Sequence, residues 1–238
     1  MAEGSGPRPT RLVLVAGTAT EVGKTWVGAQ VLRRLRDAGM SVAARKPAQS
    51  ADRDDPAPSD AEVLGAASGE PAATVCAPHR TYGVAMAPPM AAEVLGLPVP
   101  SLDDLLAELA WPPGPDGGPV DIGWLETVGG PRSPIAADGD AVALAGRVAP
   151  DLIVLVADAG LGTVNAVALS VAALASADAR ASGPAPTVVF LNRFDAEDDL
   201  HRRNRDWLRT REGLEVVVDL EALSNRVGGE PPGISPRR

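Results

Sequence analysis

The chain has 238 residues, of which 45% are hydrophobic and 22% charged, enough for one α/β domain or two small ones. Lys and Arg together number 22 against 31 Asp and Glu, and the resulting net charge of −9 argues against binding to nucleic-acid phosphates. The single cysteine, Cys76, excludes an intramolecular disulfide and favours a cytoplasmic protein.

The two ends of the chain have a different composition from the rest. Residues 1–10 and 228–238 are rich in Gly, Pro and Ser, which predicts disordered tails. The N-terminal residues lack the apolar core of a signal peptide. The longest apolar run, 152–157, is far shorter than the roughly 20 residues that a membrane span requires. We therefore expect no membrane partner and a single domain over residues 11–227.

Within this domain, short apolar runs alternate with helical patterns. The runs are continuous rather than alternating, which is typical of strands buried on both faces of a parallel sheet. In chain order they cover 12–16, 41–44, 122–126, 152–157, 187–191 and 215–218, and the second and the last are the weakest.

Helices are expected between these runs. Apolar residues recur at a spacing of four after Thr25 until Gly39, which suits a C-terminal glycine. Ser59 and Ser101 each open a further helix with a capping pattern, and 163–177 predicts another. The alternation predicts a doubly wound, mainly parallel sheet with helices on both faces, as in P-loop NTPases. Such sheets bind ligands beyond the C-terminal ends of their strands.

The segment GTATEVGKT, from Gly17 to Thr25, lies between the first strand and the first helix. A P-loop in this position wraps backbone N–H groups around phosphates, and its lysine and threonine reach phosphate oxygens and Mg²⁺. This assigns Lys24 and Thr25. Five residues separate the two glycines rather than the common four, so the alternative is a glycine turn that happens to precede Lys-Thr.

Lys46 is one of only two lysines in a chain with 20 arginines. It follows a predicted strand, and Pro47 holds it in an extended conformation on the P-loop side of the sheet. A lysine amine is a compact point charge that could bind an anionic nucleophile or stabilise charge in phosphoryl transfer. The alternative is a surface lysine before a turn.

Three further polar residues lie at strand ends or helix starts. Glu126 ends a buried strand, where a carboxylate is costly unless it is paired or binds a metal. Asp60 is either a Mg²⁺ ligand or an acid favoured by the dipole of its own helix. Asn192 offers donors and acceptors suited to a purine edge, although turn initiation explains it equally well.

Taken in order, these motifs resemble the dethiobiotin synthetase family over about residues 11–192. GTATEVGKT is similar to the family's P-loop with its unusual spacing, and RKPAQS to the segment that carries Lys46 and Ser50. SDA matches at Asp60, and LETVGG is similar to the family's EGAGG at Glu126. AGLGTVNA and FLN are similar to two family segments that carry an asparagine, here Asn165 and Asn192.

The resemblance implies an ATP-dependent cyclo-ligase that converts 7,8-diaminononanoate and CO₂ to dethiobiotin with Mg²⁺, acting as a homodimer. It implies that Lys24 and Lys46 are catalytic and that Thr25, Asp60 and Glu126 hold the metal. Substrate contacts would come from Ser50, Thr127 and Asn165, the last across the dimer interface. Nucleotide binding would involve Glu21, Val22, Gly23, Lys24, Thr25, Trp26, Asp60, Glu126, Gly129 and Asn192.

The sequence also departs from the family pattern. Thr127 and Val128 replace Gly-Ala after the strand-end glutamate, Met90 replaces a histidine, and Arg193 follows Asn192 where the family commonly has Asp. These changes motivate two alternatives: a non-catalytic or substrate-shifted P-loop paralogue, and a ligase that acts on another amine or acid. ATPases that partition DNA would carry a further lysine at the position of Ala19, which disfavours that subclass.

Overall fold

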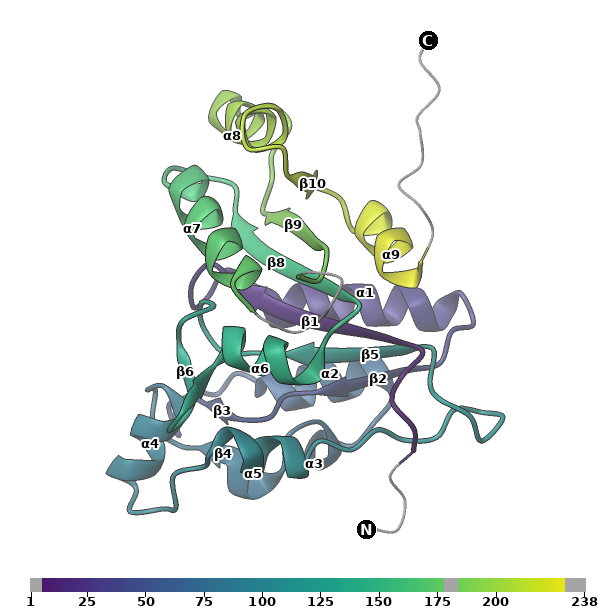
Figure 1. Ribbon diagram of the computed structural model, residues 1–238, viewed down its shortest axis with the longest axis vertical. Helices are drawn as coiled ribbons and strands as arrows, with labels where there is room; N and C mark the ends of the chain where they lie inside the picture. Colours follow the sequence, from purple (N-terminus) through teal and green to yellow (C-terminus); the bar gives the residue numbers. More distant parts are fainter. Residues whose placement is uncertain (1–5, 178–183, 230–238) are drawn as a thin grey trace.

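The computed structural model describes residues 6–177 and 184–229. A six-stranded parallel sheet forms its centre, in the order β10-β9-β8-β1-β5-β2 (Figure 1). The strands are β1 (Arg11–Gly17), β2 (Val42–Arg45), β5 (Ile122–Glu126), β8 (Leu152–Asp158), β9 (Thr187–Asn192) and β10 (Glu215–Val217). All six predicted strands are confirmed, with ends that differ by no more than one residue from the apolar runs.

The continuous apolar character of these strands follows from their burial on both faces. Side chains of a strand alternate between its two faces. In β1, Leu12 and Leu14 contribute to the hydrophobic core on one face of the sheet, and Val13 and Val15 to the core on the other. All four are at most 2% exposed, so a polar residue in this run would lie in one of the two cores.

Helices cover both faces of the sheet, as predicted (Figure 1). Helices α1 (Lys24–Asp37), α2 (Asp60–Ser68), α3 (Ala72–Val75) and α9 (Leu220–Gly228) pack against the core that contains Val13. The opposite core receives α4 (Pro88–Val94), α5 (Leu102–Ala107), α6 (Ala141–Val148), α7 (Thr163–Ala175) and α8 (Asp199–Thr210). Within the described residues, no helix is long and apolar enough to cross a membrane.

The predicted helix starts at two serines are confirmed. Ser59 caps α2, and Ser101 caps α5; in each case the serine side chain and an acid three residues later satisfy each other's backbone N–H groups. In α2 this reciprocal pair is Ser59 and Glu62, and it fixes where the helix begins. Asp60 is therefore the first residue of α2, so its position relative to the sheet is set by the cap.

Short elements that the sequence did not predict flank the sheet. A parallel pair joins β3 (Gln49–Ser50) to β4 (Thr81–Tyr82), which follows the 3₁₀ turn η1 (Pro78–Arg80). An antiparallel pair joins β6 (Pro134–Ala136) to β7 (Gly139–Asp140). Both pairs follow main strands on the side where those strands end, so they add walls to the region that holds the predicted site.

Part of the predicted N-terminal tail, residues 6–10, lies against the domain in the structure. The Gly6 N–H donates to the carbonyl of Trp111 at 2.6 Å, and Pro9 is buried beside Gly123. The Gly/Pro-rich loop 111–119 thus covers this segment, which is a tertiary contact that composition does not report. Gly228 ends α9, and the remaining predicted tail residues, 1–5 and 230–238, lie outside the described residues.

Candidate active site

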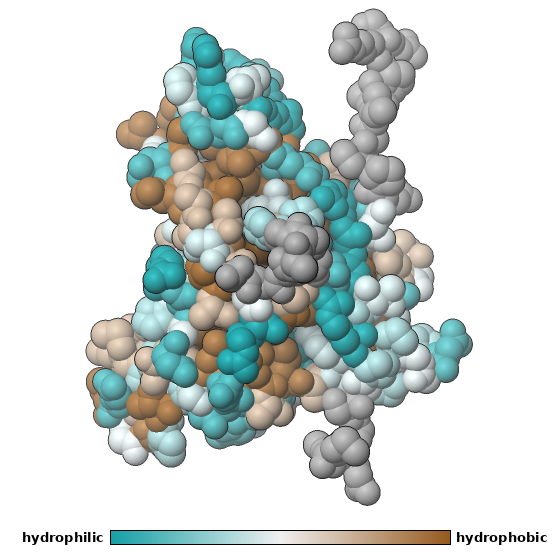
Figure 2. Space-filling model, viewed as in Figure 1, coloured by the Kyte–Doolittle hydropathy of each residue, from teal (hydrophilic) through white to brown (hydrophobic). Residues whose placement is uncertain are grey.

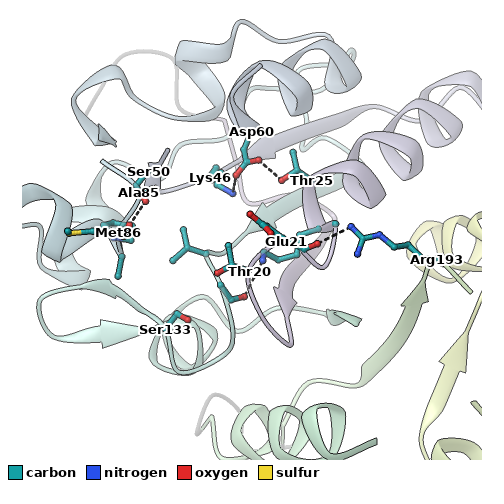
Figure 3. Close-up of a pocket in the computed structure, with 16 residues that line it drawn as sticks. Thr20, Glu21, Thr25, Lys46, Ser50, Asp60, Ala85, Met86, Ser133 and Arg193 are labelled. Carbon is teal, nitrogen blue, oxygen red and sulfur yellow. Dashed lines mark hydrogen bonds and ion pairs between the residues drawn. The ribbon is translucent and has the colours of Figure 1, made fainter. Parts of the chain in front are cut away.

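A cavity of about 820 Å³ opens at the C-terminal ends of β1, β2 and β5 (Figure 3). One wall is the loop between β1 and α1, and it includes Thr20, Glu21 and Gly23. The facing walls come from segments that are distant in sequence, around Ser50, Met86 and Val128. The cavity is where a doubly wound sheet is expected to bind its ligand.

The loop before α1 has the geometry of a phosphate-binding loop. Gly23 lies in the left-handed region with φ 92°, and α1 begins at the next residue. Lys24 is 7% exposed, and its ammonium donates to the carbonyls of Ala19 and Gly129, each at 3.2 Å. Burial lowers the pKa of Lys24, with the carboxylate of Glu126 opposing the shift. Lys24 thus joins the loop to the segment after β5.

Lys46 contacts two carboxylates, and Figure 3 shows it beside Asp60 and Thr25. Its ammonium is 2.8 Å from Oε1 of Glu126 and 2.5 Å from Oδ2 of Asp60, and the side chain is 3% exposed. The hydroxyl of Thr25 is 2.7 Å from both Asp60 Oδ1 and Glu126 Oε1. Four predicted site residues, from four elements or element ends, therefore meet within hydrogen-bonding distance.

The charges in this cluster stabilise one another. Burial by itself lowers the pKa of Lys46, but the carboxylates of Glu126 and Asp60 outweigh it and raise the pKa above its ordinary value. Burial favours the neutral form of Asp60, but Lys46 and the Thr25 hydroxyl lower its pKa below the usual range. Lys46 is therefore a protonated cation at neutral pH, and it is held between two carboxylate side chains.

Glu126 offers a test of whether these residues suit a divalent cation. The carboxylate is completely buried, and in the described part of the chain its Oε2 has no hydrogen-bond partner. A buried charged oxygen without a partner is costly, which indicates a site that a further cationic group completes. The nearby oxygens of Thr25 and Asp60 are the hard donors that Mg²⁺ prefers. The donor set thus fits the metal.

One predicted site residue, Thr127, differs from expectation in the segment after β5. Thr127 is completely buried, and its hydroxyl donates to the carbonyl of Val15 at 2.9 Å, so it does not reach the cavity. Val128 lines the cavity instead. Val128, rather than Thr127, therefore faces the cavity, and a substrate contact in this segment stays a prediction.

Five other predicted residues do not line the cavity: Val22, Trp26, Glu126, Asn165 and Asn192. Asn192 is 6% exposed, and its amide donates to the carbonyl of Val22 at 2.9 Å, so it supports the P-loop. The indole of Trp26 is 51% exposed on the outside of α1. Asn165 is exposed on α7. A purine contact by Asn192 and a substrate contact by Asn165 stay predictions.

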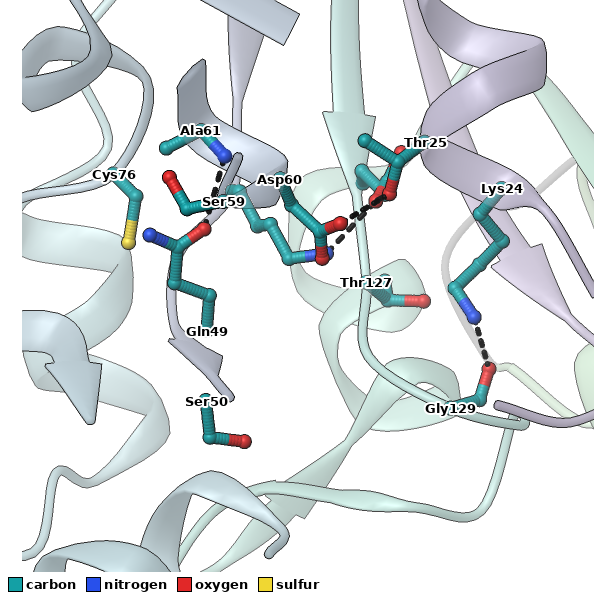
Figure 4. Close-up of polar contacts among 12 residues, drawn as sticks. Lys24, Thr25, Gln49, Ser50, Ser59, Asp60, Ala61, Cys76, Thr127 and Gly129 are labelled. Atoms are coloured by element: carbon teal, nitrogen blue, oxygen red, sulfur yellow. Dashed lines mark hydrogen bonds and ion pairs between the residues drawn. The ribbon is translucent and has the colours of Figure 1, made fainter. Parts of the chain in front are cut away.

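The structure adds residues that the sequence did not single out. Gln49 is 6% exposed and accepts from the N–H of Ala61 at 3.0 Å (Figure 4). Its amide also donates to the hydroxyl of Thr81 at 3.1 Å, so it ties the start of α2 to β3 and β4. Met86 and Ser133 line the cavity. Gln49 lies within the RKPAQS motif, but a neutral side chain whose partners are remote in sequence carries no signal of its own.

The fold and the loop define a P-loop nucleotide-binding protein of the doubly wound class. The solved structure of a plasmid partition protein from Borrelia burgdorferi is similar in fold, with a TM-score of 0.53 and 12% identity over 93% of this chain and 97% of that one. A family model described as an AAA domain matches residues 11–226.

Relatives with higher sequence identity show which family of this class the chain belongs to. The chain is 36% identical to the ATP-dependent dethiobiotin synthetase BioD of Haloferax mediterranei over 206 residues, which cover 86% of this chain and 81% of that protein. It is 33% identical to the protein of the same name from Rhodococcus jostii over 91% of this chain and 88% of that one. The chain belongs to the dethiobiotin synthetase family.

Proposed function

We propose that the protein closes the ureido ring of dethiobiotin from 7,8-diaminononanoate, CO₂ and ATP, with Mg²⁺. The observation that carries the proposal is the buried ammonium of Lys46, held by Asp60 and Glu126 beside the P-loop lysine, in one cavity with Ser50. A second fixed cation next to the phosphate loop is what a reaction needs when an anionic nucleophile attacks a phosphoryl group.

In the proposed reaction, one amine of the substrate takes up CO₂ as a carbamate. A carbamate oxygen then attacks the γ-phosphorus of ATP, and ADP leaves. The second amine attacks the carbonyl carbon of the mixed anhydride, loses its proton, and expels inorganic phosphate as the ring closes. Lys24 and the N–H groups of the P-loop hold the phosphates, and Lys46 stabilises the carbamate and the transferring phosphoryl group.

The remaining polar groups of the cavity complete this assignment. Thr25, Asp60 and Glu126 would hold Mg²⁺, which, when bound, supplies charge neutralisation at the β- and γ-phosphate oxygens. Ser50 lines the cavity, and its single O–H donates to the carbonyl of Met86. Rotation of this hydroxyl away from Met86 would let it donate to a carbamate instead. The cytoplasm is the proposed compartment, consistent with the single unpaired cysteine, Cys76.

We also propose that the protein acts as a homodimer with Asn165 at the interface. On the face shown in Figure 2, apolar side chains reach the surface around α7. Leu161, just before this helix, is 91% exposed, and Leu169, four residues after Asn165, is 64% exposed. Apolar side chains around a polar one suit a subunit interface. Replacing Leu169 by Lys should yield a monomer in analytical ultracentrifugation if the proposal is right.

The activity is tested by phosphate release from ATP, which should require both 7,8-diaminononanoate and bicarbonate. Lys46→Arg should lower this turnover at least about 100-fold while ATP still binds, because the planar guanidinium does not reproduce a point charge. Arg203→Ala, which changes an exposed ion pair on α8, is the matched control. Full turnover by Lys46→Arg, or failure of the wild-type gene to support a dethiobiotin-requiring strain, would contradict the proposal.

A substrate-shifted relative is the alternative, and Val128 is the observation that favours it. Its branched side chain lines the same cavity as Ser50 and Met86, at a position where the family pattern has a smaller residue. Turnover with diamines of different chain lengths separates the two functions. A preference for another diamine over 7,8-diaminononanoate would support the alternative.

A further inference from the structure

Two consecutive residues, the buried Asn192 at the end of β9 and Arg193 after it, donate to two consecutive carbonyls of the P-loop. The amide of Asn192 donates to the carbonyl of Val22 at 2.9 Å. The guanidinium of Arg193 donates to the carbonyl of Glu21 at 3.1 Å (Figure 3). The sheet order separates β9 from β1 by β8, so these side chains span the neighbouring strand to reach the loop.

The backbone is unusual at both ends of the Arg193 contact. Glu21 has φ 62° and Arg193 has φ 56°, and both lie in the left-handed region that side-chain-bearing residues rarely adopt. Among the described residues that are not glycine, Ala149 alone shares this conformation. Such backbone strain persists only where surrounding contacts fix it, and it concentrates at ligand-binding sites. The contact from Arg193 is one that fixes Glu21.

The guanidinium is itself held in place. Its other terminal nitrogen is 3.1 Å from Oδ2 of Asp158, the last residue of β8. The second oxygen of Asp158 accepts from the N–H of Gly160 at 2.8 Å, which fixes the carboxylate. A planar guanidinium can serve a carboxylate and a carbonyl at once, whereas a lysine amine has no such fork. Arg193 therefore connects the end of the sheet to the loop, and it also lines the cavity.

We propose that Arg193 is a positioning residue for the nucleotide. By holding Glu21 in its left-handed conformation, it keeps the P-loop closed in the shape that aims its N–H groups at phosphate. The inference rests on the nucleotide binding that the proposed function includes, and it adds a residue that P-loop motifs do not contain. Nucleotide affinity should depend on Arg193, whereas chemistry at saturating nucleotide should not.

The test measures the dissociation constant of MgATP by calorimetry and, separately, the KM for ATP and kcat. Arg193→Ala should weaken MgATP binding and raise KM about tenfold, with kcat within about twofold of wild type. The MgATP affinity of Arg193→Lys should lie between those of wild type and Arg193→Ala, because one amine can bind either Asp158 or Glu21 but not both. Arg203→Ala, whose partner on α8 is remote from the cavity, should match wild type in affinity and in thermal midpoint.

A second substitution separates positioning from direct contact with the nucleotide. Asparagine tolerates the left-handed region better than glutamate does. Glu21→Asn should therefore restore most of the affinity when it is combined with Arg193→Ala. If the double variant binds MgATP no better than Arg193→Ala alone, Arg193 does not act through Glu21 and the proposal is wrong. It is also wrong if Arg193→Ala behaves like Arg203→Ala.

The binding measurement distinguishes this proposal from the proposed activity. If the wild type binds MgATP but does not turn over 7,8-diaminononanoate, the activity fails, and the affinities of the Arg193 variants still decide the positioning role. If the wild type binds no nucleotide at all, both proposals fail. Circular dichroism and the thermal midpoint of each variant show whether a loss of binding reflects a loss of folding.

Discussion

Replacing Lys46 by Met tests how the buried charges are balanced. The substitution keeps most of the aliphatic side chain but removes the ammonium that lies 2.8 Å from Glu126. Glu126 is 0% exposed and would be left only with the Thr25 hydroxyl, a donor that it shares with Asp60. The carboxylate of Asp60, whose side chain is 44% exposed, can recover hydration instead. Most of the free-energy cost of removing the ammonium therefore comes from the buried, unpaired carboxylate of Glu126.

The expected magnitude follows from this asymmetry. Removing one partner of a buried ion pair lowers the free energy of unfolding by about 3–5 kcal/mol. For a chain of this length, that loss corresponds to a fall in the thermal midpoint of roughly 6–20 °C. Adding Glu126→Gln removes the uncompensated charge, so the double variant should regain about 2 kcal/mol over Lys46→Met. Neither variant should turn over substrate.

Urea unfolding followed by tryptophan fluorescence measures these differences, with EDTA present so that no divalent cation compensates for the missing lysine. Wild type, both single variants and the double variant form a double-mutant cycle for Lys46 and Glu126. If Lys46→Met unfolds within about 1 kcal/mol of wild type, the pair is not buried in the manner described. A double variant that is less stable than Lys46→Met would also refute the reasoning.

Two further predictions concern single side chains. Gly28→Ala should destabilise the protein by about 1–3 kcal/mol, because a Cβ there would lie 2.8 Å from the buried indole nitrogen of Trp124. Gly146→Ala, where a Cβ would meet nothing within 4 Å, should be neutral or stabilising in the same urea assay, and equal effects of the two substitutions would contradict the prediction. Thr127→Gly should lower the free energy of unfolding by about 1–3 kcal/mol and leave the KM for the diamine unchanged, because its hydroxyl bonds Val15 away from the cavity. Val128→Ala should change that KM, because Val128 lines the cavity. The reverse pattern in steady-state kinetics would show that Thr127 faces the substrate.

The sequence by itself determined the architecture and the centre of the site. Continuous apolar runs must be buried on both faces, and runs that alternate with helices must form a parallel sheet with crossovers. Side chains that follow such strands gather at one edge of the sheet. For this reason Lys24, Lys46 and Glu126 could be placed together from one-dimensional spacing. In the structure Lys24 and Lys46 line one cavity, and the buried Glu126 contacts Lys46.

Residues whose roles depend on partners far along the chain could not be read in this way. The sequence shows that Thr127 follows Glu126, but not that its hydroxyl turns toward Val15 and leaves Val128 to face the cavity. Gly6 reads as part of a tail until Trp111 pairs with it.

In the sequence, Arg193 is only a departure from the family pattern after a strand. Its left-handed backbone and its contact with Glu21 across β8 are visible only in the tertiary structure. Local patterns determine which elements form and which ends of strands meet. The direction of each side chain, and the partner that satisfies it, are decided by the packing of segments that the sequence keeps apart.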